Sequence, residues 1–140
     1  MGKTILRDVK LEVNGVDLSD HVQSIEVDES WANVDVTGMG AAFKERLLGI
    51  GDASMKVTFF QDFAAAEIHA TLSPLAGSNT PFPVVMTPDS TVGVSATNPT
   101  FTMQAVLDGY DPVKGKVGDA STMDVTFWNA DQEGIVVAAT

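Results

Sequence analysis

Two histidines and several acidic pairs are the side chains of this 140-residue chain that could support catalysis or bind a metal. His21 follows a predicted turn and His69 falls in a predicted helix, where a lone histidine is ordinarily a surface or packing residue. The chain has no cysteine, which excludes disulfides, thiolate catalysis and cysteine-ligated metal sites. Signatures of zinc proteases, EF-hands, phosphate-binding loops and serine hydrolases are missing as well. Two acid pairs could bind calcium, Asp17 with Asp20 and Asp28 with Glu29, but neither lies in the dense ligand loop of a calcium site. We therefore expect no catalytic residue, no cofactor and no metal.

The charge of the chain limits its partners. Eight Lys and Arg stand against nineteen Asp and Glu, which gives a formal net charge of -11. Such a surface repels nucleic acid and anionic lipid and so disfavours tight binding to nucleic acid, although loose contact with passing nucleic acid is compatible with it. The N-terminal residues contain no secretory segment, and no apolar run could anchor the chain in a membrane. We expect the protein to be made and kept in a cytoplasm until it assembles.

Strict alternation of apolar and polar residues dominates the rest of the chain and predicts β-strands. In 53–60 the alternation points Ala53, Met55, Val57 and Phe59 toward a core, and the strand that begins at Ile5 points apolar residues inward in the same way. The pattern predicts a mainly β, antiparallel sandwich or barrel of seven or eight strands in a single domain, residues 1–140. The expected strands are 5–13, 22–29, 33–37, 53–60, 82–87, 100–108, 121–128 and a short terminal strand at 134–140.

One segment has helical rather than strand periodicity and predicts a single flanking helix over 62–73. Asp62 is a suitable N-cap, and Pro74 disfavours helical geometry at the residue before it and so ends the helix. An apolar stripe would seal the core, which gives this helix a structural role: Ala64, Ala65, Ile68, Leu72 and Leu75.

The segment 37–52 fits neither pattern. It contains four glycines, at 38, 40, 49 and 51, around large apolar residues and two of the eight basic residues. A long loop of this composition is poorly suited to lying free in water. It is either a short helix folded onto its own domain or a glycine-hinged arm that orders on a partner, and its basic residues favour an acidic partner such as a second copy. The candidate contact residues are Phe43, Lys44, Arg46, Leu47, Leu48 and Ile50.

Three aromatic residues leave a different function open. A small β-domain that binds a sugar or another small ligand would need an aromatic side chain where polar groups converge in a pocket. Core or interface packing is the simpler interpretation of these residues: Trp31, Tyr110 and Trp128.

Taken in order, several segments resemble the major tail tube protein of long, non-contractile tailed bacteriophages, which is similar in fold to the tube proteins of contractile injection systems and type VI secretion. The resemblance covers most of the chain and is carried by strand and turn patterns: "GVDLSDHVQSIEV" (15–27), "VDVTGMG" (34–40), "FKERLLGIGDASMKVTFFQDFAAAEIHATL" (43–72), "SATNPTFTMQAVLDGYDPV" (95–113) and "VGDASTMDVTF" (117–127). It implies a β-domain with one flanking helix, six copies in a ring, and rings stacked into a hollow tube for the genome. It implies neither catalysis nor a cofactor. Its expected partners are further copies of the chain and the tape-measure, tail terminator and tail-tip proteins.

Within this family, the 37–52 segment is expected to be the contact between stacked rings. A channel lined with carboxylates would let DNA slide without sticking. The candidate lining residues are acids on the polar faces of the strands: Glu26, Asp28, Asp35 and Asp124. Another virion component, such as a tail terminator or a head-decoration protein, is the alternative within the structural class.

Overall fold

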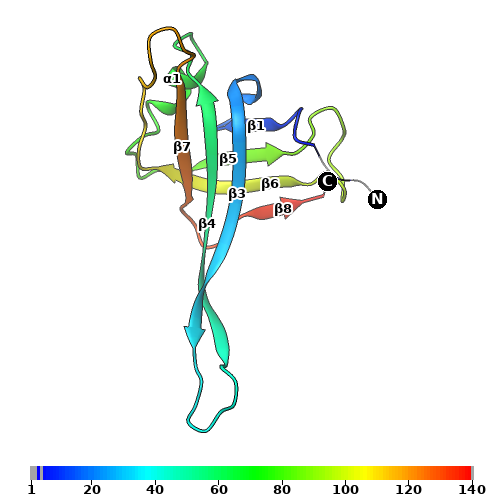
Figure 1. Cartoon of the computed structure of the whole chain (residues 1–140). Coiled ribbons are helices and arrows are strands. Elements are labelled where there is room, and N and C mark those ends of the chain that lie inside the picture. Colours follow the sequence, from blue (N-terminus) through cyan, green and yellow to red (C-terminus); the bar gives the residue numbers. More distant parts are fainter. Residues whose placement is uncertain (1–2, 4, 140) are drawn as a thin grey trace.

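The structure is a computed structural model that describes residues 3 and 5–139 (Figure 1). It confirms the prediction of a mainly β fold with antiparallel strands and one helix, since eight strands form one sheet beside a single short α-helix. The strands are β1 (Lys10–Val13), β2 (Val16–Asp17), β3 (Val22–Asp35), β4 (Arg46–Phe60), β5 (Phe82–Thr87), β6 (Thr100–Leu107), β7 (Thr122–Asn129) and β8 (Val136–Ala138). A 3-10 turn, η1 (Ser19–His21), precedes β3, and the helix α1 (Ile68–Leu72) follows β4.

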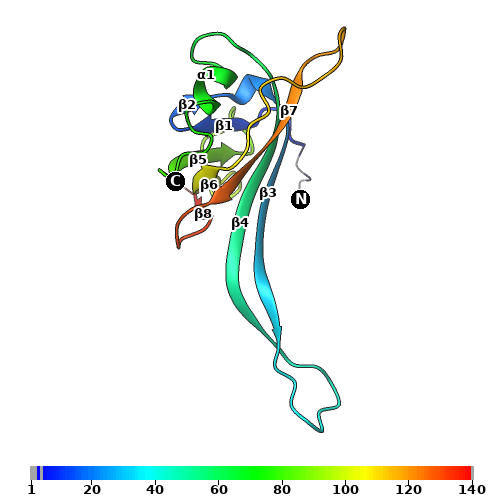
Figure 2. The same ribbon diagram turned by 90° about the vertical axis from the view of Figure 1, so that its left-hand side faces the viewer.

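The sheet is continuous but folded over. Its strand order is β2-β1-β5-β6-β7-β4-β3, with β8 beside β6. Strand β6 forms the corner, because Thr100–Thr102 pair with β8 and Ala105–Leu107 pair with β7. Figures 1 and 2 show that β3, β4 and β7 run steeply across β1, β5, β6 and β8, so the two parts of the sheet lie face to face. The expected sandwich or barrel is thus one open sheet bent into two layers.

The core lies between these layers and is built by the alternation visible in the sequence. On β4, the four residues expected to point inward (Ala53, Met55, Val57 and Phe59) are all buried, and the inward residues of β7 are buried as well. The rings of Phe82 and Phe127 meet edge to face with centroids 6.0 Å apart, which joins the two layers. Burial of this apolar surface is the main term that stabilises the fold.

The predicted helix over 62–73 is much shorter than expected. It begins at Ile68, and the residue at its N-cap position is Glu67 rather than Asp62, with no side-chain cap. Ala66 adopts a left-handed backbone with φ of 62°, and one such residue interrupts a right-handed helix. Ile68 and Leu72 are buried as predicted, whereas the two alanines assigned to the apolar stripe, Ala64 and Ala65, are exposed in the loop.

The remaining differences concern the bounds of the strands and the short strand β2, which was not predicted. The first strand starts at Lys10 instead of residue 5, and Ile5 is exposed. The two strands predicted at 22–29 and 33–37 are one strand, β3, which ends at Asp35. Residues 46–52, expected in a loop or helix, belong to β4. Thr140, at the end of the predicted terminal strand, lies outside the described residues.

Candidate assembly surfaces

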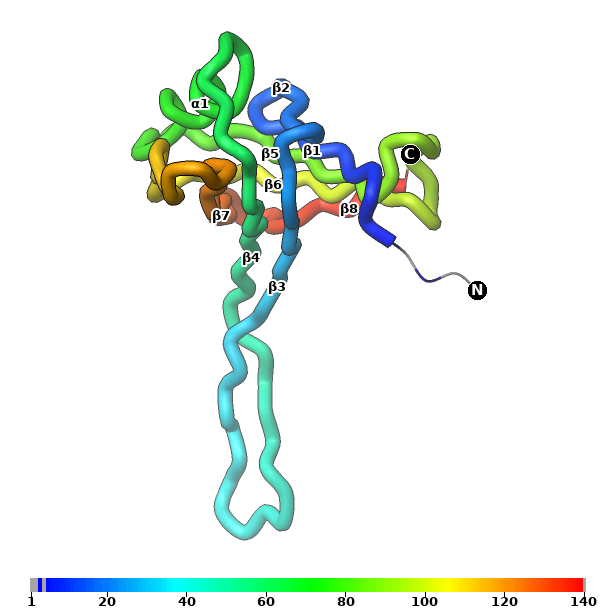
Figure 3. Tube along the Cα trace, turned by 45° about the horizontal axis from the view of Figure 1, so that its top comes forward, coloured from blue at the N-terminus to red at the C-terminus, as the bar shows by residue number. Residues whose placement is uncertain are grey.

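Strands β3 and β4 continue far beyond the rest of the sheet and form a projecting hairpin, residues 30–52, which we call the arm (Figures 2 and 3). The ladder between the two strands runs from the pair Val22–Phe59 to the pair Asp35–Arg46. Strand β7 accompanies β4 only over residues 54–60, so no third strand among the described residues pairs with the arm. Every residue of the arm is exposed. An isolated two-stranded hairpin is only marginally stable in water, so a neighbour that covers the arm would add stability.

The arm carries large apolar side chains with nothing to cover them. Phe43 at the tip is 86% exposed, and Leu47, Leu48 and Ile50 on β4 are exposed too. Patches of this kind mark protein interfaces rather than free surface. The structure brings all the predicted contact residues into this one hairpin, with Phe43 and Lys44 in the loop and the others on β4. The interpretation of 37–52 as a helix folded onto its own domain is therefore wrong.

A small hydrogen-bond network shapes the tip of the arm. The Thr37 hydroxyl donates to Oδ1 of Asp35 at 2.6 Å and accepts a bond from the backbone N–H of Glu45 at 2.8 Å. The Thr37 hydroxyl and backbone N–H both donate to the Asp35 carboxylate, and these bonds lower its pKa. This carboxylate thus orders the turn between the two strands.

Trp31 lies across a glycine at the base of the arm. A Cβ atom placed on Gly51 would be 2.6 Å from Nε1 of the Trp31 indole, which is well inside van der Waals contact. Trp31 and Gly51 are also cross-strand partners in the ladder. The absence of a side chain at Gly51 lets the indole, 55% exposed, cover the backbone there.

The outer face of β3, β4 and β7 gathers three of the four acids predicted to line a channel. Glu26 is paired with Lys56, and Asp28 with Ser54, on the face turned away from the core. Asp124 on β7 accepts a hydrogen bond from Thr58 on β4 at 2.7 Å. All three acids are exposed, with Glu26 and Asp28 on β3 and Asp124 on β7, the two strands that flank β4.

Asp35, the fourth acid, is separate from this face. It lies in the arm, nine residues from Glu26 along the same strand, and an odd separation places side chains on opposite sides of a regular strand. Asp52 on β4, which was not among the predicted acids, lies on the same face as Glu26 and Asp28 of β3, since its partner in the ladder is Ser30. The even spacing of 52, 54, 56 and 58 was the signal that could have identified it.

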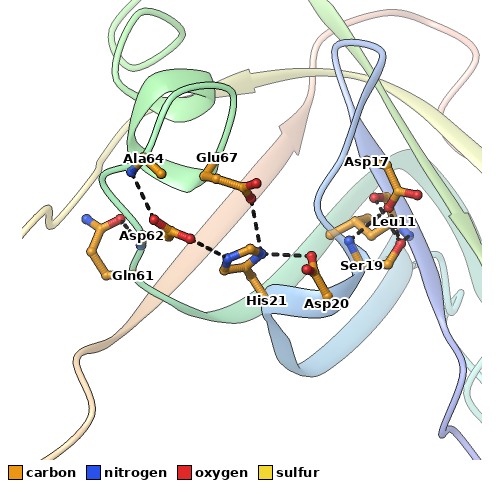
Figure 4. Close-up of polar contacts among 9 residues, drawn as sticks. All are labelled: Leu11, Asp17, Ser19, Asp20, His21, Gln61, Asp62, Ala64 and Glu67. Carbon is orange, nitrogen blue, oxygen red and sulfur yellow. Dashed lines mark hydrogen bonds and ion pairs between the residues drawn. The ribbon is translucent and has the colours of Figure 1, made fainter.

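At the end of the ladder opposite the arm, His21 is surrounded by three carboxylates (Figure 4). Its Nδ1 lies 2.8 Å from Asp20 and 3.5 Å from Glu67, and its Nε2 lies 2.9 Å from Asp62. The imidazole side chain is only 14% exposed. In the sequence His21 looks like an ordinary residue, because Asp62 and Glu67 come from the loop before α1, far along the chain.

The carboxylates determine the protonation of this histidine. Burial alone would lower the pKa of His21, but the hydrogen bonds to Asp62 and Asp20 outweigh burial and raise it above the usual value. The pKa of Asp62 is lowered, first by the backbone N–H of Ala64 and then by His21. Both ring nitrogens face carboxylate oxygens, so the protonated imidazolium satisfies the site best.

Donor atoms of Asp20, His21 and Glu67 lie within 4.8 Å of one another, a spacing that a metal ion could bridge. Asp17 and Asp20, the acid pair considered from the sequence, bind different partners. The Asp17 carboxylate accepts bonds from the backbone N–H and the hydroxyl of Ser19, whereas Asp20 binds His21.

The aromatic residues considered for ligand binding do not meet. Trp31 lines a groove of about 370 Å³ at the base of the arm, and Trp128 lines a different and smaller one of about 120 Å³. The Tyr110 hydroxyl is engaged by Nε2 of Gln61 at 3.0 Å and by Nδ1 of His69 at 2.9 Å. Because the three aromatic side chains line different sites, they do not form one shared ligand pocket. Packing and interface contacts are the simpler explanation for them.

Within the described residues, no helix has the length and apolar character needed to cross a membrane. No protein-family model matches the chain, and no curated protein sequence matches it.

Solved structures with similar folds include chains of gene transfer agent particles and of an extracellular contractile injection system. A chain in the virion of a native gene transfer agent particle superimposes with a TM-score of 0.68, at 12% identity over 95% of each chain. A chain in the tail of an empty gene transfer agent particle, with C6 symmetry, gives a TM-score of 0.64 at 14% identity over 94% of this chain and 93% of its own. A chain in the sheath/tube terminator structure of an extracellular contractile injection system gives a TM-score of 0.68 at 9% identity over 99% of both. The described chain therefore has, over nearly its whole length, the fold of a chain in each of these assemblies.

Proposed function

We propose that the protein is a structural subunit of a virion tail, a non-catalytic component that assembles with further copies of itself. The observation that carries this proposal is the combination of the fold with the arm. The fold is similar over nearly the full chain to chains in tail particles, and the arm exposes an apolar surface that only a partner would cover.

The more specific proposal is the tail tube of a long, non-contractile phage tail. Six copies form a ring, the rings stack, and the arm, with Phe43, Lys44, Arg46, Leu47, Leu48 and Ile50, makes the contact between rings. In support, one structure with the same fold is a tail of C6 symmetry. The subunit would act as one domain in the virion after assembly in the host cytoplasm, with the tape-measure, terminator and tail-tip proteins as further partners.

The acidic outer face is proposed to line the bore of the tube. Glu26 and Asp28 on β3 and Asp124 on β7 lie on either side of β4 on one exposed face, and the chain as a whole is strongly acidic. Carboxylates facing the bore repel DNA phosphates, so the genome passes without binding. Asp35 lies in the arm and would belong to the ring contact instead.

A tail terminator is the second candidate, because one similar fold comes from a sheath/tube terminator structure. A terminator would close a tube with one ring rather than build stacks. The length of the assemblies formed by pure protein separates the two functions.

Negative-stain electron microscopy and sedimentation of concentrated protein test the proposal. Stacked tubes with a central channel support the tail tube, and isolated rings support the terminator. A correctly folded protein that remains monomeric at high concentration across a range of salt concentrations contradicts both.

A further inference from the structure

The two ends of the long β3–β4 ladder have complementary surfaces. At one end is the tip of the arm, residues 43–48, and at the other end the ladder begins beside His21 and finishes at Phe60. The residues around this second end form what we call the head patch: Asp20, Asp62 and Glu67, which Figure 4 shows, and Phe63, which follows Asp62 in the chain. Resting on the proposed self-assembly, we propose that the head patch of one copy binds the arm tip of a second copy.

The tip carries two basic residues and one acid, Glu45, so it has a net positive charge beside apolar side chains. Neither Lys44 nor Arg46 has a carboxylate within 4 Å in the part of the chain that the structure describes, whereas Arg7, Lys10 and Lys114 each do. Phe43 and Leu47 flank these two basic residues in the sequence and are exposed. The tip therefore has cations free to pair with a partner and apolar surface to bury against it.

The head patch offers the opposite charge beside a matching apolar surface. Three carboxylates face one imidazole there, so the patch keeps a net negative charge even when His21 is protonated. The Asp20 side chain is 81% exposed and can reach a partner. Phe63 is 61% exposed, and the neighbouring alanines of its loop are exposed as well.

The position of the two surfaces fixes the mode of association. They lie at opposite ends of the molecule along the direction of β3 and β4, as Figure 2 shows. A contact between them is heterologous and head-to-tail, which leaves a free tip and a free patch at the two ends of every assembly. Such a contact propagates into a stack instead of closing as a dimer.

A charge exchange between the two surfaces tests the inference. The tip reversal Lys44→Glu with Arg46→Glu should raise the concentration needed for stacking by about tenfold or more, and so should the patch reversal Asp20→Lys with Glu67→Lys. The four substitutions together restore the wild-type net charge and should recover stacking. Asp131→Lys with Glu133→Lys makes the same charge change as the patch reversal in the β7–β8 loop and serves as its control. Circular dichroism melting checks that each variant is folded.

The outcomes separate this inference from the proposed function. If the wild type stacks and the combined variant stacks while the two reversals do not, the pairing is established. If the wild type stacks but the reversals have no effect, or the combined variant fails to recover while folded, the head patch is not the acceptor and the proposed function stands. A wild type that forms neither rings nor stacks overturns both.

Discussion

Nε2 of His21 lies 2.9 Å from Oδ2 of Asp62, although 41 positions separate the two residues in the sequence. His21 directly precedes β3, and Asp62 stands two residues after the end of β4. The contact therefore ties together the two chain segments that enter and leave the long hairpin. It also places a titratable pair beside the surface that we propose binds a second copy.

The first prediction concerns the pH dependence of stability. Because the pKa of His21 is raised in the folded state, its stabilising effect is fully present below the unfolded value of 6.5 and is lost as pH rises through the folded value. The pKa of Asp62 is lowered, so its contribution is present above the unfolded value of 3.8 and is lost as pH falls. Urea denaturation of the monomer from pH 5 to 9 should show stability declining on the alkaline side. In His21→Gln this decline should flatten, while in His69→Gln, whose ring bonds Tyr110 instead, it should persist. An unchanged profile in His21→Gln would contradict the assignment.

The second prediction concerns the core between the layers. Phe127 is fully buried and packs edge to face on Phe82, so Phe127→Ala should lower the free energy of unfolding by about 3–5 kcal/mol. Phe43→Ala removes the same ring from the exposed tip and should change the monomer by less than about 0.5 kcal/mol. Chemical denaturation of both variants at low protein concentration measures the difference. Equal effects would mean that the tip packs on its own domain.

The third prediction concerns the glycine beneath Trp31. In a Trp128→Phe background, which leaves one tryptophan, Gly51→Ala should push the indole into solvent, because the new methyl group overlaps it. The fluorescence emission should shift to the red and acrylamide quenching should increase. Gly38→Ala, in the same arm, adds a methyl group that would meet nothing within 4 Å and should leave the spectrum unchanged. Identical spectra for all three proteins would show that the indole does not rest on Gly51.

The fourth prediction separates the arm from the fold. No core residue belongs to the arm, so deletion of residues 41–48 should leave the melting transition of the monomer nearly unchanged. The same deletion should abolish stacking, which sedimentation and electron microscopy report directly. Normal tubes formed by the folded deletion variant would show that the rings are joined elsewhere.

The fifth prediction concerns the acids proposed to line the bore. Like charges crowded around a channel repel one another, and salt screens exposed charges over about 10 Å at 0.1 M. The yield of tubes should therefore rise between low and physiological ionic strength. Asp28→Asn with Asp124→Asn should weaken this salt dependence, and Asp108→Asn with Asp119→Asn, two exposed acids outside that face, should not. If the yield of wild-type tubes does not change with ionic strength, the channel is not lined with acids.

Alternation in the sequence was enough to predict β5, β6, β7 and the body part of β4, since each buries one face. The burial of Met55 and Val57 follows directly from it. The same rule failed in the arm, because neither face of a projecting hairpin is buried and apolar residues need not alternate there. Leu47 and Leu48 are adjacent, which no half-buried strand would favour, and yet both lie in β4.

The helix and the His21 site show the other limits of the sequence. The spacing of Ile68 and Leu72 identified the buried turn, but nothing local revealed that Ala66 would adopt a left-handed conformation. The carboxylates around His21 come from segments that only the folded sheet brings together. Charge composition predicted an acidic surface, and the pairing of β4 with β7 decided which acids share a face.

The uninterrupted course of β3 and β4 from the body into the arm has a mechanical consequence. Inter-strand hydrogen bonds in an antiparallel ladder lie across the strand direction. Tension applied at the tip pulls both strands of the arm in the same direction, so their backbones carry the load into the body. There the bonds between β4 and β7, over residues 54–60, are loaded together in shear instead of being opened one after another. A hairpin anchored in this way can transmit a pulling force into the body of the subunit without tearing loose at its base.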